Sequence, residues 1–419
     1  MAEPADHPQP ARRRRRAVRS RGADAVTDLA ALAPAPGAPI PWSRLEAFLD
    51  DGLGGVAALA ATPQDATFHA EGDVWTHTRM VVEALVALPA WRALDDVGRA
   101  VTFAAALLHD VGKPQTTRRD DDGRLTSRGH SGRGEAMARA ALWRRGVPFG
   151  LREHVCALIR WHQVPFFGIT REPADAERTA ARLSLRLRHR WLAVVAEADA
   201  RGRRCADPAD QARMLEHTAL WLELCRDLDC VDAPLRFADD HARVLYFEAE
   251  RPGARRPDVA AHDDTTAEVV VMCGLPASGK DTWLAAHGVG PVVSLDDLRD
   301  QLDVEPTEGQ GEVIAAAREA ARVHLRAGAP FAWNATNLAA SLRAKVIGLM
   351  RGYRARVHLV YCEAPAHAHP ARNRDRARPV PARAIGRMLG RWSVPALDEA
   401  HRVTHVVDDD GPLRWPPAR

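Results

Sequence analysis

The sequence predicts a helical domain followed by an α/β domain with a mostly parallel sheet and helices on both of its faces. From Trp42 to about Glu250, apolar residues recur every three or four positions, which is the period of an amphipathic helix. From residue 268 onward, short apolar runs of strand length alternate with helical stretches. Buried strands that alternate with helices are typical of a parallel sheet covered on both sides.

The helical half is expected to span residues 39–250. Its periodic segments are 74–88, 96–108, 134–145, 151–161, 174–187, 191–200 and 209–228. Residues 251–267 begin with Arg-Pro-Gly and contain a further proline, which favours a linker. The α/β half is expected to span residues 268–419. Its predicted strands are 269–272, 292–295, 331–333, 357–361 and 403–407.

Residues 1–38 are rich in Ala, Pro and Arg, include a run of consecutive arginines and lack apolar periodicity. This composition predicts a disordered tail. The tail is either a segment without a role or a basic arm that adds affinity for RNA. A secretory signal is not expected, because no apolar segment follows the arginines.

The composition excludes several classes of protein. A chain with 46% hydrophobic and 27% charged residues is typical of a soluble globular protein. No apolar run approaches the roughly 18 residues that a membrane span requires. The six cysteines show no C-x-x-C spacing, which argues against a zinc ribbon or a disulfide framework and favours the reducing cytoplasm. A net charge of +3 is too small to indicate a polyanionic partner by itself.

Histidines and aspartates recur on successive helices of the first half. The set consists of His77, His109, Asp110, His130, His162 and Asp199. Imidazole and carboxylate together suit Mn, Fe, Co, Ni or Zn, and suit Mg²⁺ less well. An ion held in this way acidifies its water and stabilises charge that grows on a phosphoryl oxygen. Asp110 is placed to bridge two ions, and Lys113 would add a cation beside the phosphate.

An ordinary role is the alternative for each of these residues alone. A single histidine, such as His69, His189 or His217, is more often a surface residue or a satisfied core residue. Lys113 could merely favour the C-terminus of a helix. The ordered set favours a metal site, because its members follow one another on successive helices and Lys113 follows the His-Asp pair.

The order of His77, His109-Asp110 and Asp199 resembles the HD phosphohydrolase superfamily. The segments Glu-Gly-Asp-Val-Trp-Thr-His-Thr and Leu-His-Asp-Val-Gly-Lys are similar to the HD domains of bacterial CCA-adding enzymes. The resemblance covers roughly residues 65–205 and implies an all-helical fold. It implies that these four residues are the core metal ligands. His130 and His162 match the positions that hold a second ion in some members, and His154 is a weaker candidate.

A glycine-rich loop follows the first predicted strand of the second half. It reads Gly-Leu-Pro-Ala-Ser-Gly-Lys-Asp-Thr and opens a helix, which is the context of a phosphate-binding P-loop. Its candidate nucleotide-binding residues are Gly274, Ser278, Gly279, Lys280, Asp281 and Thr282. Lys280 is expected to reach the β- and γ-phosphates. Asp281 stands where Ser or Thr normally binds Mg²⁺, so either Asp281 or Thr282 would serve that ion.

Polar residues follow the next two strands at the edge where ligands bind in such sheets. Asp296 is placed to take a proton from an attacking hydroxyl, and Arg299 lies one helical turn further on. The alternative for Asp296 is a helix N-cap, and both roles could coexist. Asn334, Thr336 and Asn337 could orient ligand or water at the third strand. A later segment is dense in arginine and predicts either a lid over the phosphate or a solvated helix. Its arginines are Arg372, Arg374, Arg376, Arg378, Arg383, Arg387 and Arg391.

Together these motifs resemble the polynucleotide 5′-kinase family over about residues 268–395. The resemblance implies that Asp296 is the general base and that Arg299 binds a phosphate of the acceptor strand. Arg372 and Arg376 would be the lid arginines on the donor. Some members of the family are homotetramers, which leaves a homo-oligomer open here. The departures from the family pattern are Asp281 and Asn334.

The order of the two halves resembles the bifunctional bacterial HD phosphohydrolase–polynucleotide kinase family, which is implicated in RNA repair. The resemblance implies transfer of the γ-phosphate of ATP or another NTP, with Mg²⁺, to a 5′-OH end of RNA or DNA. It also implies removal of 2′,3′-cyclic or terminal phosphate with one or two transition-metal or Mg²⁺ ions. A separate RNA ligase is an expected partner, because the sequence shows no ligase motif. The rivals are a small-molecule kinase fused to a nucleotide phosphohydrolase, and a kinase with an HD module that only binds nucleic acid.

Overall fold

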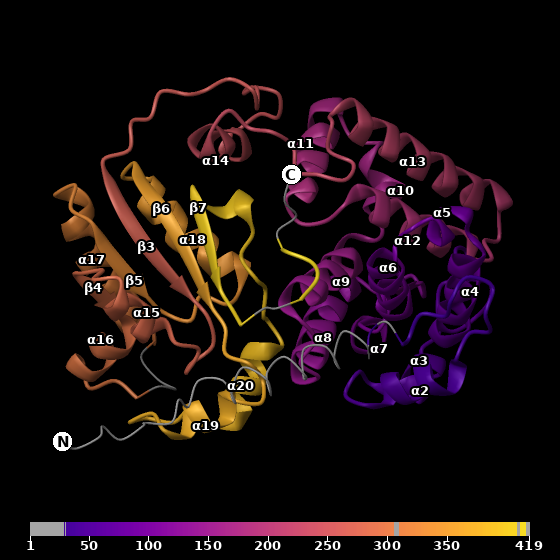
Figure 1. The fold of residues 1–419 in the computed structure, drawn as a ribbon, viewed down its shortest axis with the longest axis horizontal. Coiled ribbons are helices and arrows are strands. Elements are labelled where there is room, and N and C mark those ends of the chain that lie inside the picture. The colour runs from indigo at the N-terminus through magenta and orange to yellow at the C-terminus, as the bar shows by residue number, and fades with distance from the viewer. Residues whose placement is uncertain (1–28, 30, 306–309, 409–410, 416–419) are drawn as a thin grey trace, which may run out of the picture.

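The computed structural model describes residues 29, 31–305, 310–408 and 411–415. Figure 1 shows a helical body, in indigo to magenta, beside a body built on one sheet, in orange to yellow. The two predicted fold classes and their order along the chain are therefore confirmed.

The helical body contains every helix that the periodicity predicts, together with short helices that it did not. Its helices are α2 (Trp42–Asp50), α3 (Gly55–Ala60), α4 (Val74–Ala87), α5 (Pro89–Arg92), α6 (Asp96–Leu108), α7 (Lys113–Thr116), α8 (His130–Arg144), α9 (Phe149–Trp161), α10 (Val164–Gly168), α11 (Pro173–Ser184), α12 (His189–Arg201), α13 (Pro208–Asp227) and α14 (Asp240–Glu248). Between α7 and α8 the chain forms a small antiparallel hairpin of β1 (Arg118–Arg119) and β2 (Leu125–Thr126). Each of its strands is too short for an apolar alternation to appear in the sequence.

Helix α6 lies at the centre of this body. Its residues from Ala100 to Leu108 are all buried, and the helix packs against α4, α9 and α12. Asp95 begins α6, because its carboxylate accepts a hydrogen bond from the amide of Gly98 at 2.7 Å. The helix ends at the buried His109-Asp110 pair. A rigid buried helix therefore carries this pair into the middle of the domain.

The second body is a five-stranded parallel sheet with the order β4-β5-β3-β6-β7. Its strands are β3 (Ala267–Cys273), β4 (Val292–Ser294), β5 (Phe331–Asn334), β6 (Ala355–Cys362) and β7 (Arg402–Val406). Its helices are α15 (Lys280–Ala286), α16 (Leu295–Gln301), α17 (Gln310–Arg326), α18 (Ala340–Arg351), α19 (His369–Arg374), α20 (Ala382–Leu389) and the 3₁₀ turn η1 (Leu397–Glu399). All five predicted strands are confirmed. The first strand, β3, lies in the middle of the sheet, where connections leave in both directions and ligands typically bind.

The predicted disordered tail at residues 1–38 lies largely outside the described residues. Leu29 and Leu32, near its end, are 2% exposed and pack into the core of the helical body. The prediction of disorder is therefore wrong for this part, because burial of two leucines favours an ordered chain. Leu413, near the other terminus, packs into the same core.

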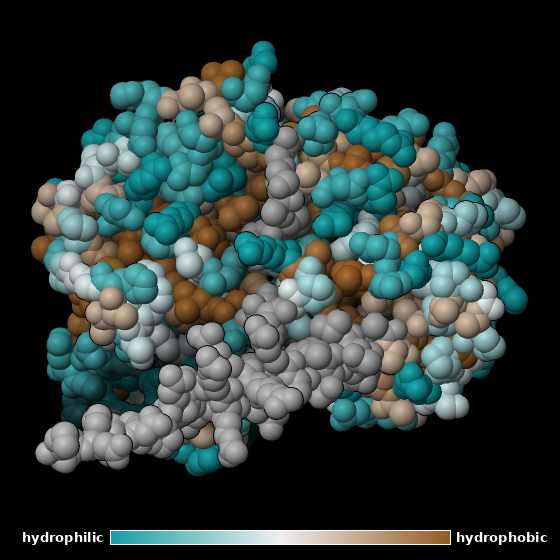
Figure 2. Space-filling model, in the orientation of Figure 1, coloured by the Kyte–Doolittle hydropathy of each residue, from teal (hydrophilic) through white to brown (hydrophobic). Residues whose placement is uncertain are grey.

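On the face drawn in Figure 2, hydrophilic residues cover much of both bodies, with apolar residues between them. Within the described part of the chain, no helix combines the length and the apolar character needed to cross a bilayer.

Buried ion pairs join the two bodies. Arg152 of α9 donates two hydrogen bonds to Glu363, which follows β6, at 2.8 and 2.7 Å, and a third to Glu153. Arg139 of α8 pairs with Glu153 and donates to the carbonyl of Trp392 at 2.7 Å. Arg152 is 1% exposed, so these charges are desolvated and depend on one another. The interface therefore has the character of a domain core.

Replacing Arg152 with methionine is expected to lower the free energy of unfolding by about 3–5 kcal/mol, because two buried carboxylates lose their shared cation. Urea-induced unfolding measures this change. Arg190→Met is the matched control, because Arg190 pairs with Asp232 at the surface and such pairs contribute about 1 kcal/mol or less. Equal losses in the two variants would contradict the structural role of the interface.

Candidate metal centre and phosphate-binding loop

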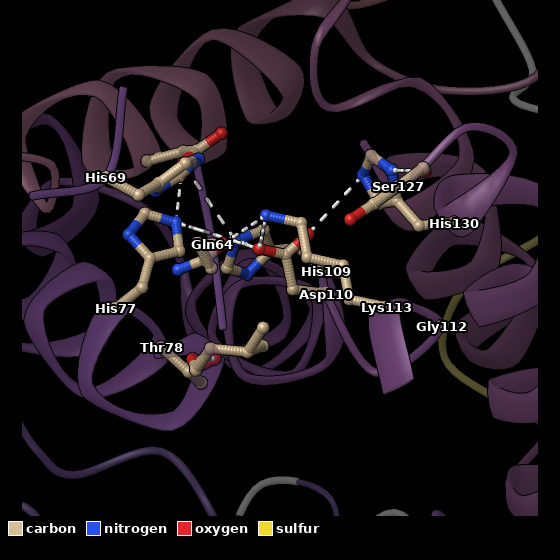
Figure 3. Close-up of polar contacts among 12 residues, drawn as sticks. Gln64, His69, His77, Thr78, His109, Asp110, Gly112, Lys113, Ser127 and His130 are labelled. Carbon is tan, nitrogen blue, oxygen red and sulfur yellow. Dashed lines mark hydrogen bonds and ion pairs between the residues drawn. The ribbon is translucent and has the colours of Figure 1, made fainter. Parts of the chain in front are cut away.

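Four of the predicted ligands meet at one point inside the helical body. His77 lies on α4, His109 and Asp110 follow α6, and Asp199 lies on α12. The Nε2 atom of His77 lies 3.1 Å from Asp199 and 3.3 Å from Nε2 of His109. Nε2 of His109 lies 3.1 Å from Asp110. Figure 3 shows how His77, His109 and Asp110 point toward one another.

The other two predicted ligands approach Asp110 from its opposite side. His130 is the first residue of α8, and its Nε2 lies 3.4 Å from Oδ1 of Asp110. His162 follows α9, and its ring centroid lies 5.4 Å from that of His130. The donor atoms of His77, His109 and Asp199 lie within 4.8 Å of one another, as do those of Asp110, His130 and His162. The convergence that the sequence predicted is therefore present, with Asp110 between two potential cation sites.

All four imidazoles are held in the same orientation. The Nδ1 atom of each ring lies 2.7–3.2 Å from a backbone carbonyl oxygen, so each ring donates from Nδ1. The four carbonyls belong to Gly202, Ala106, Ser127 and Ile159. The lone pair of every Nε2 is therefore directed at the centre of the site. An imidazole protonated on Nδ1 in this way is the tautomer that binds a metal through Nε2.

The arrangement fits a cation. With both Nδ1 atoms donating, the Nε2 lone pairs of His77 and His109 face each other at 3.3 Å, and a shared positive ion relieves that repulsion. Oδ1 of Asp110 and the Nε2 atoms of His130 and His162 are buried without a hydrogen-bond partner. A divalent ion bound there would supply positive charge to a phosphoryl group and make water more acidic.

The charges of Asp110 and His162 agree with this assignment. Burial alone would raise the pKa of Asp110, but His109 and Lys113 hold that pKa well below its usual range. Burial lowers the pKa of His162 to about 3. Asp110 is therefore ionised at neutral pH and His162 is uncharged, as metal ligands must be.

Lys113 has the position that the sequence predicted for it. Its ammonium lies 2.7 Å from Oδ2 of Asp110 and donates to Gln64 at 2.6 Å. The preceding Gly112 lies against α8, since a Cβ there would stand 2.1 Å from the carbonyl oxygen of His130. The glycine lets the segment with Lys113 approach the ligand helix closely. Lys113 is therefore beside the site and is not only a helix-end cation.

Two supporting residues escaped the sequence analysis. Arg203 donates two hydrogen bonds to Asp199, at 3.0 and 2.6 Å, and the pair is fully buried. Glu71 lies 2.9 Å from Nδ1 of both His69 and His77. The four-residue spacing of Asp199, near the end of α12, and Arg203, just beyond that end, could have indicated the first pair. No local pattern indicates the role of Glu71, which contacts the site only through the tertiary fold.

Two other buried histidines lie outside the predicted ligand set. His154 donates to the carbonyl of Gly150 at 2.8 Å and lies against Trp191, and it belongs to none of the groups of potential ligands among the described residues. His189 donates to the carbonyl of Ala180 at 2.9 Å, and it lies with Cys225 and Cys230 in a separate group of potential ligand atoms.

Replacing Glu71 with glutamine is expected to weaken metal binding about 10- to 100-fold, because the carboxylate orients His77 and increases its basicity. Calorimetric titration with Mn²⁺ measures the affinity. Glu83→Gln is the control, since Glu83 lies exposed on the same helix as His77. An unchanged affinity in Glu71→Gln would remove this residue from the site.

The glycine-rich loop connects β3 to α15 at the carboxyl edge of the sheet. Its backbone has positive φ at Gly274 (148°), Ala277 (63°) and Gly279 (99°). A Cβ at Gly274 would lie 2.3 Å from the carbonyl oxygen of Cys362. Ser278 is buried, and its hydroxyl has no hydrogen-bond partner. The loop therefore has the curled shape in which backbone amides surround a phosphate.

Lys280 lies inside this curl. Its ammonium donates to the carbonyls of Gly274 and Leu275 at 3.1 and 2.9 Å. Burial lowers its pKa, and Asp281 opposes that shift. Asp281 accepts a hydrogen bond of 2.6 Å from Asn334, the other residue that departs from the family pattern. Thr282, the alternative ligand for Mg²⁺, is exposed on α15.

Asp296 lies in the first turn of α16 and Arg299 in its last turn. Arg299 donates to Asp296 at 2.6 Å, and Arg376 lies 3.6 Å from the other oxygen of this carboxylate. The N-cap role considered for Asp296 is wrong, because Ser294 caps the helix by accepting from the amide of Asp297. The side chain of Asp296 is 72% exposed and is therefore accessible to an incoming hydroxyl.

The arginine-dense segment forms two short helices, α19 and α20, and not one. Asn373 exchanges two hydrogen bonds with the backbone of Val380, at 2.8 and 3.1 Å, and shapes the turn between them. His369 donates to the carbonyl of Pro276, which ties α19 to the glycine-rich loop. Arg372 is exposed on α19, and Arg376 lies close to the carboxylate of Asp296.

By its place in the sequence, Asn337 could orient a ligand, but its side chain has a different contact. It is 6% exposed and donates to the carbonyl of Met272 at 2.8 Å, so it braces β3. Thr336 holds the start of the glycine-rich loop, since its carbonyl accepts from the amide of Gly274 at 2.9 Å. Both residues support the loop through the backbone.

Comparison with known proteins assigns both halves to domain families. Residues 74–202 match the HD domain, and residues 269–395 match an AAA domain. The Multifunctional CCA protein of Laribacter hongkongensis (strain HLHK9) is 37% identical over 109 residues, which are 26% of this chain and 24% of that protein. The Multifunctional CCA protein of Ralstonia nicotianae (strain ATCC BAA-1114 / GMI1000) is 32% identical over 190 residues, 44% of this chain and 41% of that protein. The chain thus spans less than half the length of these relatives. It joins a helical domain that is similar to the HD domain to a P-loop domain that is similar to the AAA domain.

Proposed function

We propose that the chain remodels both ends of broken nucleic acid strands so that a separate ligase can join them. The P-loop domain transfers the γ-phosphate of ATP or another NTP to a 5′-OH end. The HD domain hydrolyses a 2′,3′-cyclic or terminal phosphate. Nuclease cleavage that leaves these two ends creates a substrate for both reactions.

In the kinase reaction, the oxygen of the 5′-hydroxyl bonds to the γ-phosphorus, the nucleoside diphosphate leaves, and Asp296 takes the hydroxyl proton. Arg299 binds a phosphate of the acceptor strand. Lys280, Arg372 and Arg376 bind the donor phosphates. The contact of Asp296 with Arg299, and the 3.6 Å approach of Arg376, support this assignment.

In the hydrolase reaction, water attacks the phosphorus and the ribose oxygen leaves with a proton. His77, His109, Asp110 and Asp199 would hold one ion. Asp110, His130 and His162 would hold another. Lys113 is near enough to Asp110 to neutralise charge on the phosphoryl group. Transition-metal ions fit this donor set better than Mg²⁺.

The observation that carries the proposal is the presence of two phosphate-handling sites in one tightly packed chain. Helix α8 begins at His130 and reaches the P-loop domain through Trp143, which donates to the carbonyl of Ala364 at 3.1 Å. The ring of Trp143 lies 5.7 Å from that of His369, which contacts the loop at Pro276. Such a permanent pairing favours two reactions on the same damaged molecule.

End analysis of an RNA with a 5′-OH and a 2′,3′-cyclic phosphate tests the proposal. After incubation with ATP and Mn²⁺, Ni²⁺, Co²⁺ or Mg²⁺, we expect a 5′-phosphate and a 3′ end without its cyclic phosphate. Labelling of nucleosides or sugars without labelling of the oligonucleotide would favour a small-molecule kinase. Kinase activity without any end hydrolysis would favour an HD module that only binds nucleic acid.

A further inference from the structure

A cavity opens from the HD site to the surface. Its volume is about 350 Å³, and it is lined by Lys113 and His130 at the site and by Arg128, Gln163 and Phe167 further out. The cavity therefore connects residues of the candidate metal centre with exposed residues at the surface. Groups around the mouth would contact whatever is attached to the reacting phosphate.

Phe167 lines this cavity, and its ring is exposed to solvent. It is 57% exposed and is the one aromatic residue among the exposed large apolar residues of the described ranges. Its neighbour Phe166 is 1% exposed and anchors α10, and the carbonyl of Phe166 accepts from His217 at 2.8 Å. Helix α10 begins two residues after the ligand His162. The exposed ring is therefore carried by an anchored helix that begins close to His162 in the sequence.

Arg128 also lines the cavity. It lies two residues before the ligand His130, and Gly129 between them has a φ of 81°. The side chain of Arg128 is 87% exposed and lies 3.7 Å from Asp120, a surface ion pair that holds it weakly. An aromatic ring and an available guanidinium thus flank the same opening.

We propose that Phe167 is a stacking platform for the base of the terminal nucleotide and that Arg128 binds the next phosphate along the strand. Single-stranded nucleic acid is recognised by this pairing of an aromatic face with a cation that follows the backbone. An exposed aromatic ring in water has a cost that base stacking removes. The substrate of the HD domain is then a single-stranded polynucleotide end and not a free nucleotide. This inference rests on the proposed hydrolase function.

Two oligonucleotides with a phosphorylated 3′ end test the platform, one with a base on its last nucleotide and one with an abasic last nucleotide. Phe167→Ala is expected to raise KM for the first by about tenfold or more and to leave KM for the second unchanged. Phe167→Trp is expected to keep the low KM, because tryptophan also stacks. Leu220→Ala is the control, since Leu220 is an exposed apolar residue of the same body outside the cavity.

Arg128→Ala tests the second contact. It is expected to raise KM for an oligonucleotide several-fold and to leave KM for a mononucleoside 2′,3′-cyclic phosphate unchanged. An equal change for both substrates would overturn the backbone contact. Equal effects of Phe167→Ala on the base-bearing and abasic ends would overturn the platform but not the hydrolase function. If the unmodified enzyme neither opened the cyclic phosphate nor released terminal phosphate from any of these substrates, the hydrolase function and this inference would both fall.

Discussion

Replacing Asp110 with asparagine is expected to reduce phosphate release by the HD domain by a factor of about a thousand or more. Asp110 faces both groups of ligands and contributes the charge that they share. Its loss removes several kcal/mol of charge stabilisation, and each 1.4 kcal/mol corresponds to a factor of ten in rate. Asparagine has nearly the same volume, so the packing around this buried position is retained. Phosphate release at saturating Mn²⁺ measures the effect.

The kinase activity of the same variant is the internal control. Asp110 lies in the other body of the molecule, so 5′-phosphorylation is expected to remain within a factor of two of the unmodified enzyme. Retention of hydrolysis would show that Asp110 is dispensable and would refute the metal centre. Parallel loss of both activities would instead indicate a folding defect.

The class and order of the two domains could be predicted from the sequence because they depend on local periodicity. Long amphipathic segments fix helices such as α6, and continuous apolar runs fix buried strands such as β3. The convergence of the candidate ligands could be predicted for a different reason. These ligands are chemically distinctive residues near the ends of successive helices. Their order along the chain can therefore be recognised without knowing how the helices pack.

Other features could not be predicted because they arise from tertiary contact. Glu363 and Arg152 are 211 positions apart in the sequence and meet only when the bodies pack together. Glu71 and Gln64 join the metal centre from a loop with no periodicity. Asn337 braces β3 and Ser294 caps α16 because of the backbone groups that their side chains contact in the folded chain. The sequence does not indicate these contacts.

Helix α14 shows how this limit affects a domain boundary. Its residues fall within the predicted helical half, residues 39–250, and Tyr246 and Phe247 do pack against α11. Yet Arg243 donates to the carbonyl of Leu397 at 3.0 Å, and His241 stacks on His401. The helix therefore bridges the two bodies. Its amphipathic pattern could identify an apolar face but not the two partners that cover it.

Replacing Lys280 with alanine is expected to reduce 5′-phosphorylation by a factor of about a hundred to a thousand. Its ammonium is the buried cation inside the curled loop, where it would meet the charge of the transferring phosphoryl group. Lys280→Arg is expected to be nearly as damaging, since the forked guanidinium cannot occupy a position shaped for a compact ammonium. Transfer of labelled phosphate from ATP to a 5′-OH oligonucleotide measures both variants.

The other two lysines of the chain provide matched controls for this experiment. Lys345 is exposed on α18, so Lys345→Ala should leave both activities unchanged. Lys113 contacts Asp110, so Lys113→Ala should impair hydrolysis and spare phosphorylation, the reverse of the result for Lys280. Because the same chemical change is made in each case, a site-specific pattern cannot result from the loss of positive charge alone. Full kinase activity in Lys280→Ala would show that the loop does not bind the donor phosphates.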